Sequence, residues 1–284
     1  MTASTSRTVA CLGPEGSFSH EFACSRFPGA ISRTSADDFE GVIRLVESGA
    51  ADIAVLPFLN SNGVDVRPAQ AAIAKACDWI CIEGCFPHKV VHNVVVAEGF
   101  KSLKKLVSKE QVFPQCTNWL GQWDGIETAP ASSTSAALAE LLRATKAERE
   151  STAVICNQLA VSLYGGEVRW AGVQNPGNTT LFLVASRRQT IASEEQALIC
   201  LTCPSEKCYE DTINDFSRAG MPLKFTSLKG EFTSELPCFL QFEVAGRASD
   251  VRKLTEQPYR SLVGAFSEEH SLAACVGAFF DDIY

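Results

Sequence analysis

The order in which predicted strands and helices follow one another constrains this chain more than any other feature. Residues 9–12 are apolar and predict a strand, and a turn-rich segment leads from them into a predicted helix over 21–27. A second helix is expected over 36–48, where apolar residues recur at helical spacing, and a strand over 52–57. Strand, helix and strand in this order predict a parallel α/β sheet that binds ligands at the carboxyl ends of its strands.

The middle of the chain repeats this alternation. Residues 90–97 are rich in valine, which is typical of a strand buried on both faces of a sheet. Four hydroxyl residues at 132–135 can cap a helix over 136–147, and a strand over 153–156 follows. A second α/β unit is therefore expected after the first.

The segment 173–184 ends this second unit. Asparagine, proline and glycine form a turn at 175–178, and the apolar run 181–184 predicts a buried strand. Thr180 therefore stands where a loop meets a strand, a place where functional residues are often found. The alternative is that the threonine hydroxyls only satisfy backbone groups of the turn.

The C-terminal third differs in pattern. Residues 187–196 are polar and predict a linker between two domains, one over 8–186 and one over 197–284. Beyond the linker, strands and helices follow in the order βαββαβ, with the last strand near 261–266. This order is the ferredoxin-like pattern.

Composition excludes several classes of function. The net charge of −8 argues against nucleic acid as a partner, because phosphate binding needs clustered Lys and Arg. No run of about 18 apolar residues is present, so no membrane partner is expected. The N-terminus lacks an apolar signal region, which makes a cytoplasmic location the default expectation. Motifs for nucleotides or NAD are absent, and no cofactor is expected.

Twelve cysteines are many for a chain of 284 residues. Cys77, Cys81 and Cys85 form one group, and a second group lies at 200–208, but neither has a histidine or a second cysteine pair at zinc-site spacing. We therefore expect reduced, buried thiols and no metal.

Five segments in order resemble the prephenate dehydratase family, whose members convert prephenate to phenylpyruvate. The segment 13–20 resembles the family's opening Gly-Pro-x-Gly-Thr-Phe-Ser, and 57–61 resembles Pro-Ile-Glu-Asn-Ser. The segment 108–116 matches Ser-His-Pro-Gln-Ala-Leu-Ala-Gln-Cys in length, and 133–137 matches Ser-Thr-Ser-Ala-Ala. The segment 178–182 falls where the family has Asn-x-Thr-Arg-Phe.

The resemblance implies an α/β fold class. Two lobes, like those of periplasmic binding proteins, would face each other over a cleft, and the C-terminal unit would be an ACT domain, which senses phenylalanine in the family. It also implies a homodimer or homotetramer and a small-molecule substrate, prephenate. Thr180 would be the donor to the departing hydroxyl. Substrate contacts carry over to residues of the matching motifs: Asn60, Ser61, Ser108, Gln115, Ser133, Thr134, Asn178 and Phe182.

The chain departs from the family pattern at three site positions. Leu181 replaces the family arginine. In the family, this arginine would bind a substrate carboxylate by charge-assisted hydrogen bonds, which contribute about 1.5–3 kcal/mol to binding. Leu59 replaces the glutamate before Asn60, and Lys109 replaces a histidine. Lys109 is a candidate to supply the missing charge in the substrate site, and a surface lysine is the alternative.

These departures leave two further functions open beside the dehydratase. One is a related prephenate decarboxylase, which gives a non-aromatic keto acid. The other is a non-catalytic protein that binds a small molecule. In the C-terminal unit the family's Glu-Ser-Arg-Pro is replaced at 227–230, which makes phenylalanine sensing doubtful.

Overall fold

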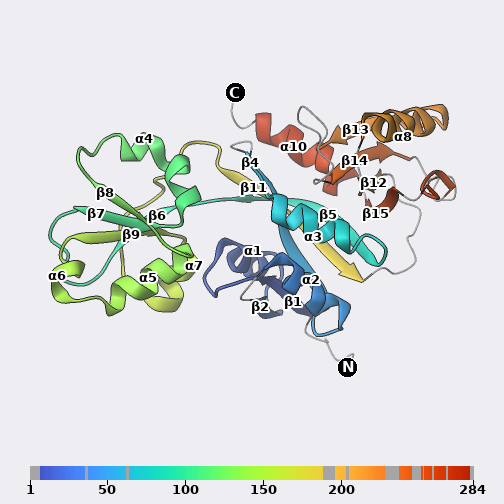
Figure 1. Cartoon of the computed structure of the whole chain (residues 1–284). Coiled ribbons are helices and arrows are strands. Elements are labelled where there is room, and N and C mark those ends of the chain that lie inside the picture. The colour runs from blue at the N-terminus through green and yellow to red at the C-terminus, as the bar shows by residue number, and fades with distance from the viewer. Residues whose placement is uncertain are drawn as a thin grey trace.

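The structure is a computed structural model that describes residues 7–35, 38–61, 64–187, 196–202, 205–227, 237–244, 251, 253–257, 259–266 and 268–281. The chain forms three units, two α/β lobes and a C-terminal unit (Figure 1). Within the described residues, ten strands from the first lobe and the C-terminal unit share one sheet, and five strands form the sheet of the second lobe.

The first lobe contains the predicted parallel sheet. Its elements in chain order are β1 (Thr8–Leu12), α1 (Phe18–Arg26), β2 (Ile31–Ser35), α2 (Phe39–Glu47), β3 (Ile53–Asn60), β4 (Val64–Asp65), α3 (Arg67–Lys75) and β5 (Ile80–Lys89). Strand β1 pairs in parallel with both β2 and β3. Helix α2 begins where the Asp38 side chain accepts from the Gly41 amide, and it buries Phe39, Val42 and Val46.

Strand β11 (Thr179–Arg187) returns to the first lobe and lies antiparallel between β3 and β5. Its alternate side chains enter two different cores. Phe182 and Val184 pack on the side of α1, whereas Leu181 and Leu183 pack in the cluster that includes residues of α2 and α3. This alternation fixes which residues of β11 face the functional site.

The second lobe is built on a sheet with the order β10-β6-β9-β7-β8. Its elements in chain order are β6 (Asn93–Val96), β7 (Lys105–Ser108), the 3₁₀ helix η1 (Glu110–Cys116), α4 (Thr117–Leu120), β8 (Glu127–Pro130), α5 (Thr134–Arg143), α6 (Lys146–Arg149), β9 (Thr152–Cys156), α7 (Gln158–Tyr164) and β10 (Glu167–Trp170). Val94 and Val96 face one core of this lobe and Val95 the other, so the predicted burial of this strand on both faces is confirmed.

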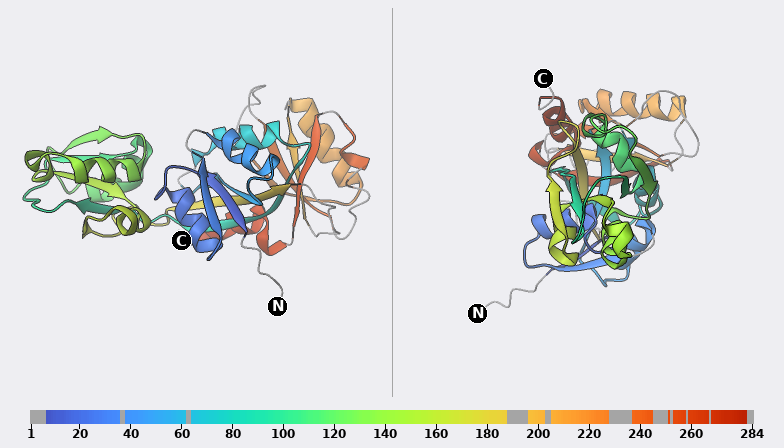
Figure 2. Two further views of the ribbon diagram at one scale, coloured as in Figure 1. Left: turned by 90° about the horizontal axis from the view of Figure 1, so that it is seen from below. Right: turned by 90° about the vertical axis from the view of Figure 1, so that its left-hand side faces the viewer.

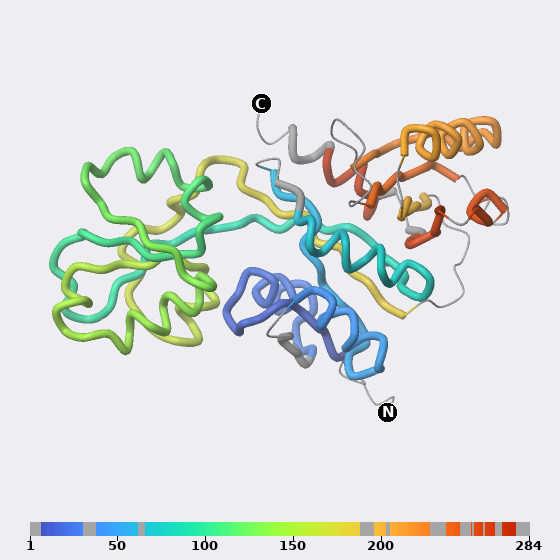
Figure 3. Tube along the Cα trace, viewed as in Figure 1, coloured from blue at the N-terminus to red at the C-terminus, as the bar shows by residue number. Residues whose placement is uncertain are grey.

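Two segments connect the lobes and run side by side (Figure 3). The Val90 amide donates to the Asn178 carbonyl at 2.9 Å, and the Val173 amide donates to the His92 carbonyl at 2.9 Å. A two-lobed fold is the predicted arrangement, and the second lobe stands apart from the rest of the molecule in Figure 2.

The C-terminal unit has the predicted ferredoxin-like strand order. Its described elements are β12 (Gln196–Leu201), α8 (Glu206–Arg218), β13 (Leu223–Thr226), β14 (Cys238–Glu243), β15 (Arg260–Phe266), η2 (Glu268–His270) and α10 (Leu272–Asp281). The order β13-β14-β12-β15 is antiparallel throughout. Most of the predicted linker at 187–196 and part of the second predicted helix lie outside the described residues.

The C-terminal unit continues the sheet of the first lobe. Strand β15 pairs in parallel with β5 at Gly264 and Ile82. Helix α10 also reaches β5, where the Cys275 thiol donates to the Cys85 carbonyl at 3.3 Å. A Cβ added at Gly84 would lie 3.0 Å from His270 Cβ, so a larger residue here would require the two segments to move slightly apart. The apolar tail that the sequence shows at 272–280 therefore contributes to the junction with β5.

The described cysteines are buried except Cys24, Cys81 and Cys208. Cys203 lies outside the described residues. In the same part of the chain, no group of three or more His, Cys, Asp or Glu side chains could hold a metal ion. Within the described ranges, no helix is both long and apolar enough to cross a membrane.

Candidate functional site

Thr180 lies at the start of β11, between the ends of two neighbouring strands. Its Cα partner on β3 is Asn60, and its Cα partner on β5 is His88. Residues directly opposite in antiparallel strands point to the same face of a sheet, so the three side chains share one face. Phe182 also lies on this face and stacks on Phe22 of α1 at 4.3 Å between ring centroids. Helix α1 therefore covers the site from this side.

The hydroxyl of Thr180 is oriented by Asn60. The Asn60 amide nitrogen Nδ2 donates to Thr180 Oγ1 at 3.0 Å. An amide NH₂ group only donates, so the threonine oxygen is the acceptor of this bond. The hydroxyl hydrogen of Thr180 is then left to donate elsewhere. Thr180 is half-buried, which keeps it accessible to a ligand.

A chain of hydrogen bonds runs from this hydroxyl into the second lobe. Asn60 Nδ2 also donates to Asn178 Oδ1 at 3.0 Å, and Asn178 Nδ2 donates to Gln115 Oε1 at 2.8 Å. Gln115 belongs to η1, and its Oε1 lies 2.9 Å from His92 Nε2. The structure thus brings together four of the predicted site residues, Thr180, Asn60, Asn178 and Gln115.

His92 is a member of this network that the sequence reasoning missed. It is 1% exposed, and its ring meets Phe18 of α1 edge-on at 5.1 Å. Burial lowers the pKa of His92, and the hydrogen bond to Gln115 and the charge of Glu21 offset this only in part. A neutral ring must carry its hydrogen on Nε2 to donate to Gln115, which leaves Nδ1 as the buried atom without a partner. In the sequence, the only sign of this residue was a single histidine within the valine-rich segment 90–97.

We expect His92 to make the protein less stable in acid. A histidine held neutral in the native state binds its proton only after unfolding. The free energy of unfolding therefore falls as the pH drops below 6.5, the ordinary pKa of histidine. The slope from one such histidine reaches about 1.4 kcal/mol per pH unit. Urea titrations of the wild type and of His92→Gln, over about two pH units around this value, measure the slope. His20, whose pKa burial also lowers, contributes equally to both proteins. Equal slopes would contradict the prediction.

Ser61 shapes the turn before Thr180. Its Oγ donates to the Gly177 carbonyl at 2.7 Å and accepts from the Thr179 amide at 3.0 Å. Gly177 has a φ of 72°, a conformation that favours glycine. Ser61 therefore fixes the backbone that presents Asn178 and Thr180.

The remaining predicted contacts lie apart from this network. Ser108 is fully buried, and its Oγ donates to the Ile155 carbonyl at 2.9 Å. Ser133 caps α5 by accepting from the Ala136 amide at 3.0 Å, and Thr134 is 5% exposed. Lys109 is exposed at the start of η1. Phe182, at 1% exposed, packs in the core below Thr180. The role of Lys109 in replacing the family arginine stays a prediction.

The N-termini of α1 and α5 meet where the lobes touch. A Cβ added at Gly16 would lie 3.1 Å from Ala160 and 3.2 Å from Ser135, and Gly16 itself has a φ of 76°. The Tyr164 hydroxyl donates to the Glu15 carbonyl at 3.1 Å across the same boundary. The glycine of the predicted 13–20 motif therefore permits close contact between the two lobes.

Leu181 does not face this site. It is fully buried in the core on the side of α2 and α3, opposite the face that carries Thr180. Its Cα partner on β3 is Leu59, which lies in the same core. The interpretation that position 181 presents a residue to the substrate carboxylate is therefore wrong for this chain, because successive strand residues point to opposite faces.

The two departures at positions 59 and 181 are one structural change. A glutamate at 59 and an arginine at 181 would be direct cross-strand neighbours of opposite charge. Here two leucines form an apolar pair in the core. Neither leucine lies on the face that carries Thr180.

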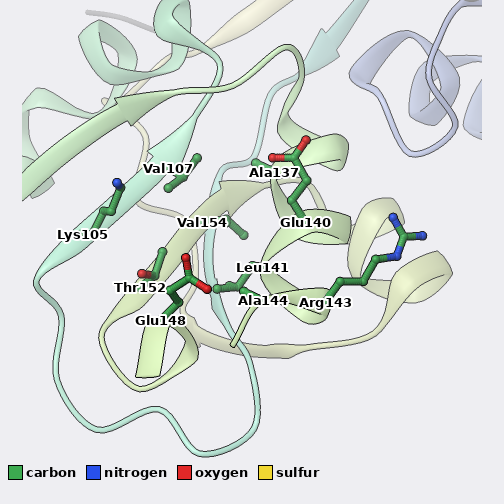
Figure 4. A pocket seen from close by; sticks show the side chains of 10 residues that line it. All are labelled: Lys105, Val107, Ala137, Glu140, Leu141, Arg143, Ala144, Glu148, Thr152 and Val154. Atoms are coloured by element: carbon green, nitrogen blue, oxygen red, sulfur yellow. The ribbon is translucent and has the colours of Figure 1, made fainter. Parts of the chain in front are cut away.

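A pocket of about 450 Å³ lies on the second lobe between α5 and the sheet (Figure 4). Two of its charged residues, Lys105 and Glu148, already have partners within the protein. Lys105 lies 3.0 Å from Glu127, and Glu148 accepts from the Thr145 hydroxyl at 2.7 Å. None of the predicted site residues lines this pocket, so it is separate from the network around Thr180.

Comparisons with known sequences agree with the resemblance. Residues 9–190 match the family described as prephenate dehydratase. A bifunctional chorismate mutase/prephenate dehydratase of Neisseria gonorrhoeae is 26% identical over 202 residues, covering 70% of this chain and 55% of the relative. The Pseudomonas aeruginosa protein of the same name is 29% identical over 185 residues, covering 64% and 49%. The chain thus spans about half the length of these curated relatives.

Solved structures share the fold. Prephenate dehydratase from Arthrobacter aurescens, in complex with L-Phe, has a TM-score of 0.75 at 21% identity, over 97% of this chain and 99% of that one. The Staphylococcus aureus prephenate dehydratase has a TM-score of 0.66 at 20% identity, over 91% and 99%. GqqA, described as a novel type of quorum quenching acylase, has a TM-score of 0.73 at 19% identity, over 92% and 97%. With the family match over residues 9–190, this chain belongs to the prephenate dehydratase family.

Proposed function

We propose that the protein converts prephenate to phenylpyruvate, with release of CO₂ and water. The observation that carries this proposal is the Thr180 hydroxyl, which accepts from Asn60 and so has its hydrogen directed to another acceptor. In this reaction the ring loses its carboxylate and its hydroxyl and becomes aromatic, so the reaction is driven by the substrate itself. The task of the protein is to hold the dianion and to stabilise the oxygen that leaves.

Thr180 donates a hydrogen bond to the departing oxygen. The chain of side chains from Asn60 through Asn178 to Gln115 holds the donor in place before the substrate arrives. A donor that is already oriented needs no reorganisation when negative charge develops on the oxygen, and this lowers the barrier. Asn60, Asn178 and Gln115 therefore act mainly by positioning in this proposal.

The substrate carboxylates are assigned to the boundary between the lobes. Ser133 and Thr134 open α5, and the backbone amides at the start of a helix favour an anion. The contact of Gly16 with Ser135 brings the start of α1 to the same boundary. Ser108 and Phe182 support the walls of this site, since both are buried.

The domain boundaries follow from this assignment. We assign catalysis to residues 8–186 and an ACT-like role in assembly or regulation to residues 197–284, with a linker between them. The strand order of the C-terminal unit supports the second assignment. Most of the segment 227–230, where the family pattern is lost, lies outside the described residues.

The product formed from prephenate tests the proposal. We expect the purified protein, incubated with prephenate near pH 8, to form phenylpyruvate and CO₂ in equal amounts, above the rate without protein. The two are measured by the absorbance of the phenylpyruvate enol in alkali and by a coupled CO₂ assay. A non-aromatic keto acid with CO₂ would identify a decarboxylase instead, and binding without turnover would identify a binding protein. Either outcome overturns the proposal.

A further inference from the structure

An ionisable pair, Glu21 and His88, lies beside Thr180. His88 is the Cα partner of Thr180 on β5, and side chains at such paired positions lie within about 5.5 Å of each other at Cβ. The His88 ring also meets Phe182 at 6.0 Å and Phe22 of α1 at 5.6 Å, both edge-on. His88 is therefore held on the face of the sheet that carries the Thr180 hydroxyl.

Glu21 fixes the orientation of this histidine. It belongs to the first turn of α1, and its Oε2 lies 3.4 Å from His88 Nε2. The side chains of His88 and Glu21 are 17% and 22% exposed, so the pair is mostly buried but still reaches the solvent. With Nε2 directed at Glu21, Nδ1 is the ring nitrogen left to act on a ligand.

Thr180 alone leaves the proton balance of the reaction incomplete. The bond from the ring to the carboxylate breaks, its electron pair enters the ring, and the hydroxyl departs with the pair of the carbon–oxygen bond. One proton must then reach the departing oxygen to make water. A threonine hydroxyl is a very weak acid and would be left as an alkoxide, whereas an imidazolium gives up its proton near neutral pH.

We propose, resting on the function proposed above, that His88 supplies the proton that converts the departing hydroxide to water, while Thr180 holds that oxygen. The prephenate dianion and the His88 imidazolium become the phenylpyruvate anion, CO₂, water and neutral imidazole. The ring then recovers its proton from solvent. Glu21 keeps the orientation of the ring through its contact with Nε2.

Other titratable or charged groups surround the pair. His20 lies in α1, and Arg26 of the same helix stands over the Phe86 ring at 4.3 Å. His92 and Cys156 approach from the side of the second lobe. Burial raises the pKa of Cys156 to about 12, and the charge of Glu21 adds to this effect. Of the groups on the site face, His88 is the histidine that combines a carboxylate partner with access to solvent.

The dependence of kcat/KM on pH tests this role. We compare the wild type with His88→Gln and Glu21→Gln, and use Lys89→Gln as the control, since Lys89 is exposed and points to the opposite face of β5. Phenylpyruvate formation is followed from about pH 6.5 to about pH 9, a range in which imidazole changes its charge. Circular dichroism and thermal unfolding establish that each variant is folded.

We expect kcat/KM of the wild type to fall as rising pH removes the imidazole proton. His88→Gln should lose about 10²- to 10⁴-fold in kcat at neutral pH and lack this fall. Glu21→Gln should lower kcat, because it removes the carboxylate that orients the His88 ring, and it is the deciding variant if His88→Gln does not fold. Lys89→Gln should follow the wild type.

If His88→Gln keeps the kcat and the pH dependence of the wild type, the role of His88 is overturned and the proposed function stands. If His88→Gln does not fold, the same result with Glu21→Gln overturns the role. A wild type that forms no phenylpyruvate would instead overturn the proposed function itself. The two failures are therefore distinguishable.

Discussion

Thr180→Ala is expected to lower kcat for phenylpyruvate formation by about 10²- to 10³-fold, the usual effect of removing one oriented donor to a developing oxyanion. The substitution removes the hydroxyl that Asn60 orients and leaves the departing oxygen without its partner. Because this bond strengthens only in the transition state, KM should change little. Steady-state rates with prephenate measure both constants.

Thr180→Ser is the matched control, since it keeps the hydroxyl and removes only a methyl group. We expect it to retain most of the wild-type rate, although a serine rotates more freely than a β-branched threonine. If Thr180→Ala keeps full activity, Thr180 is not the donor. Equal losses in the alanine and serine variants would point to a packing role for the side chain.

Leu181→Arg, the substitution that restores the family residue, is expected to destabilise the protein by about 3–5 kcal/mol, the range for an unpaired charge in a core. Leu181 is fully buried, and its cross-strand partner is Leu59. The change should not improve activity, because position 181 faces away from Thr180. The midpoint of urea unfolding measures the loss.

The double variant Leu59→Glu/Leu181→Arg separates an ion pair from a simple loss of packing. We expect the double variant to lose less free energy of unfolding than the two single variants lose together. The difference, which is the coupling energy between the two side chains, should be about 1–3 kcal/mol. Leu163→Arg is the control, because Leu163 is 47% exposed and a surface change of this kind stays within about 0.5 kcal/mol. A Leu181→Arg protein as stable as the wild type, with tighter prephenate binding, would contradict the assignment of position 181 to the core.

The order of strands and helices could be predicted from the sequence, because apolar periodicity and turn residues are local signals. Strand β5 gave no such signal, since Gly84 and Pro87 interrupt its apolar pattern. His88 lies on this strand and was therefore missed. Strand β2 was missed because its sequence, Ile31 to Ser35, is mostly polar.

The site shows the same division between local and non-local information. Motif order identified Thr180, Asn60, Gln115 and Asn178, and the structure joins them by hydrogen bonds. The face on which Leu181 lies could have been inferred from strand alternation once Thr180 was assigned to the site. Its pairing with Leu59 could not have been inferred, because the register between strand residues that are 122 positions apart depends on the whole sheet.

The pairing of β15 with β5 also bears on whether the two lobes could exist without the C-terminal unit. Strand β5 carries His88 and has β11 on one side and β15 on the other. Without the C-terminal unit it would become an open edge, with unpaired backbone groups around Ile82 available to another chain. The C-terminal unit thus covers an edge of this sheet that would otherwise be open to edge-to-edge aggregation.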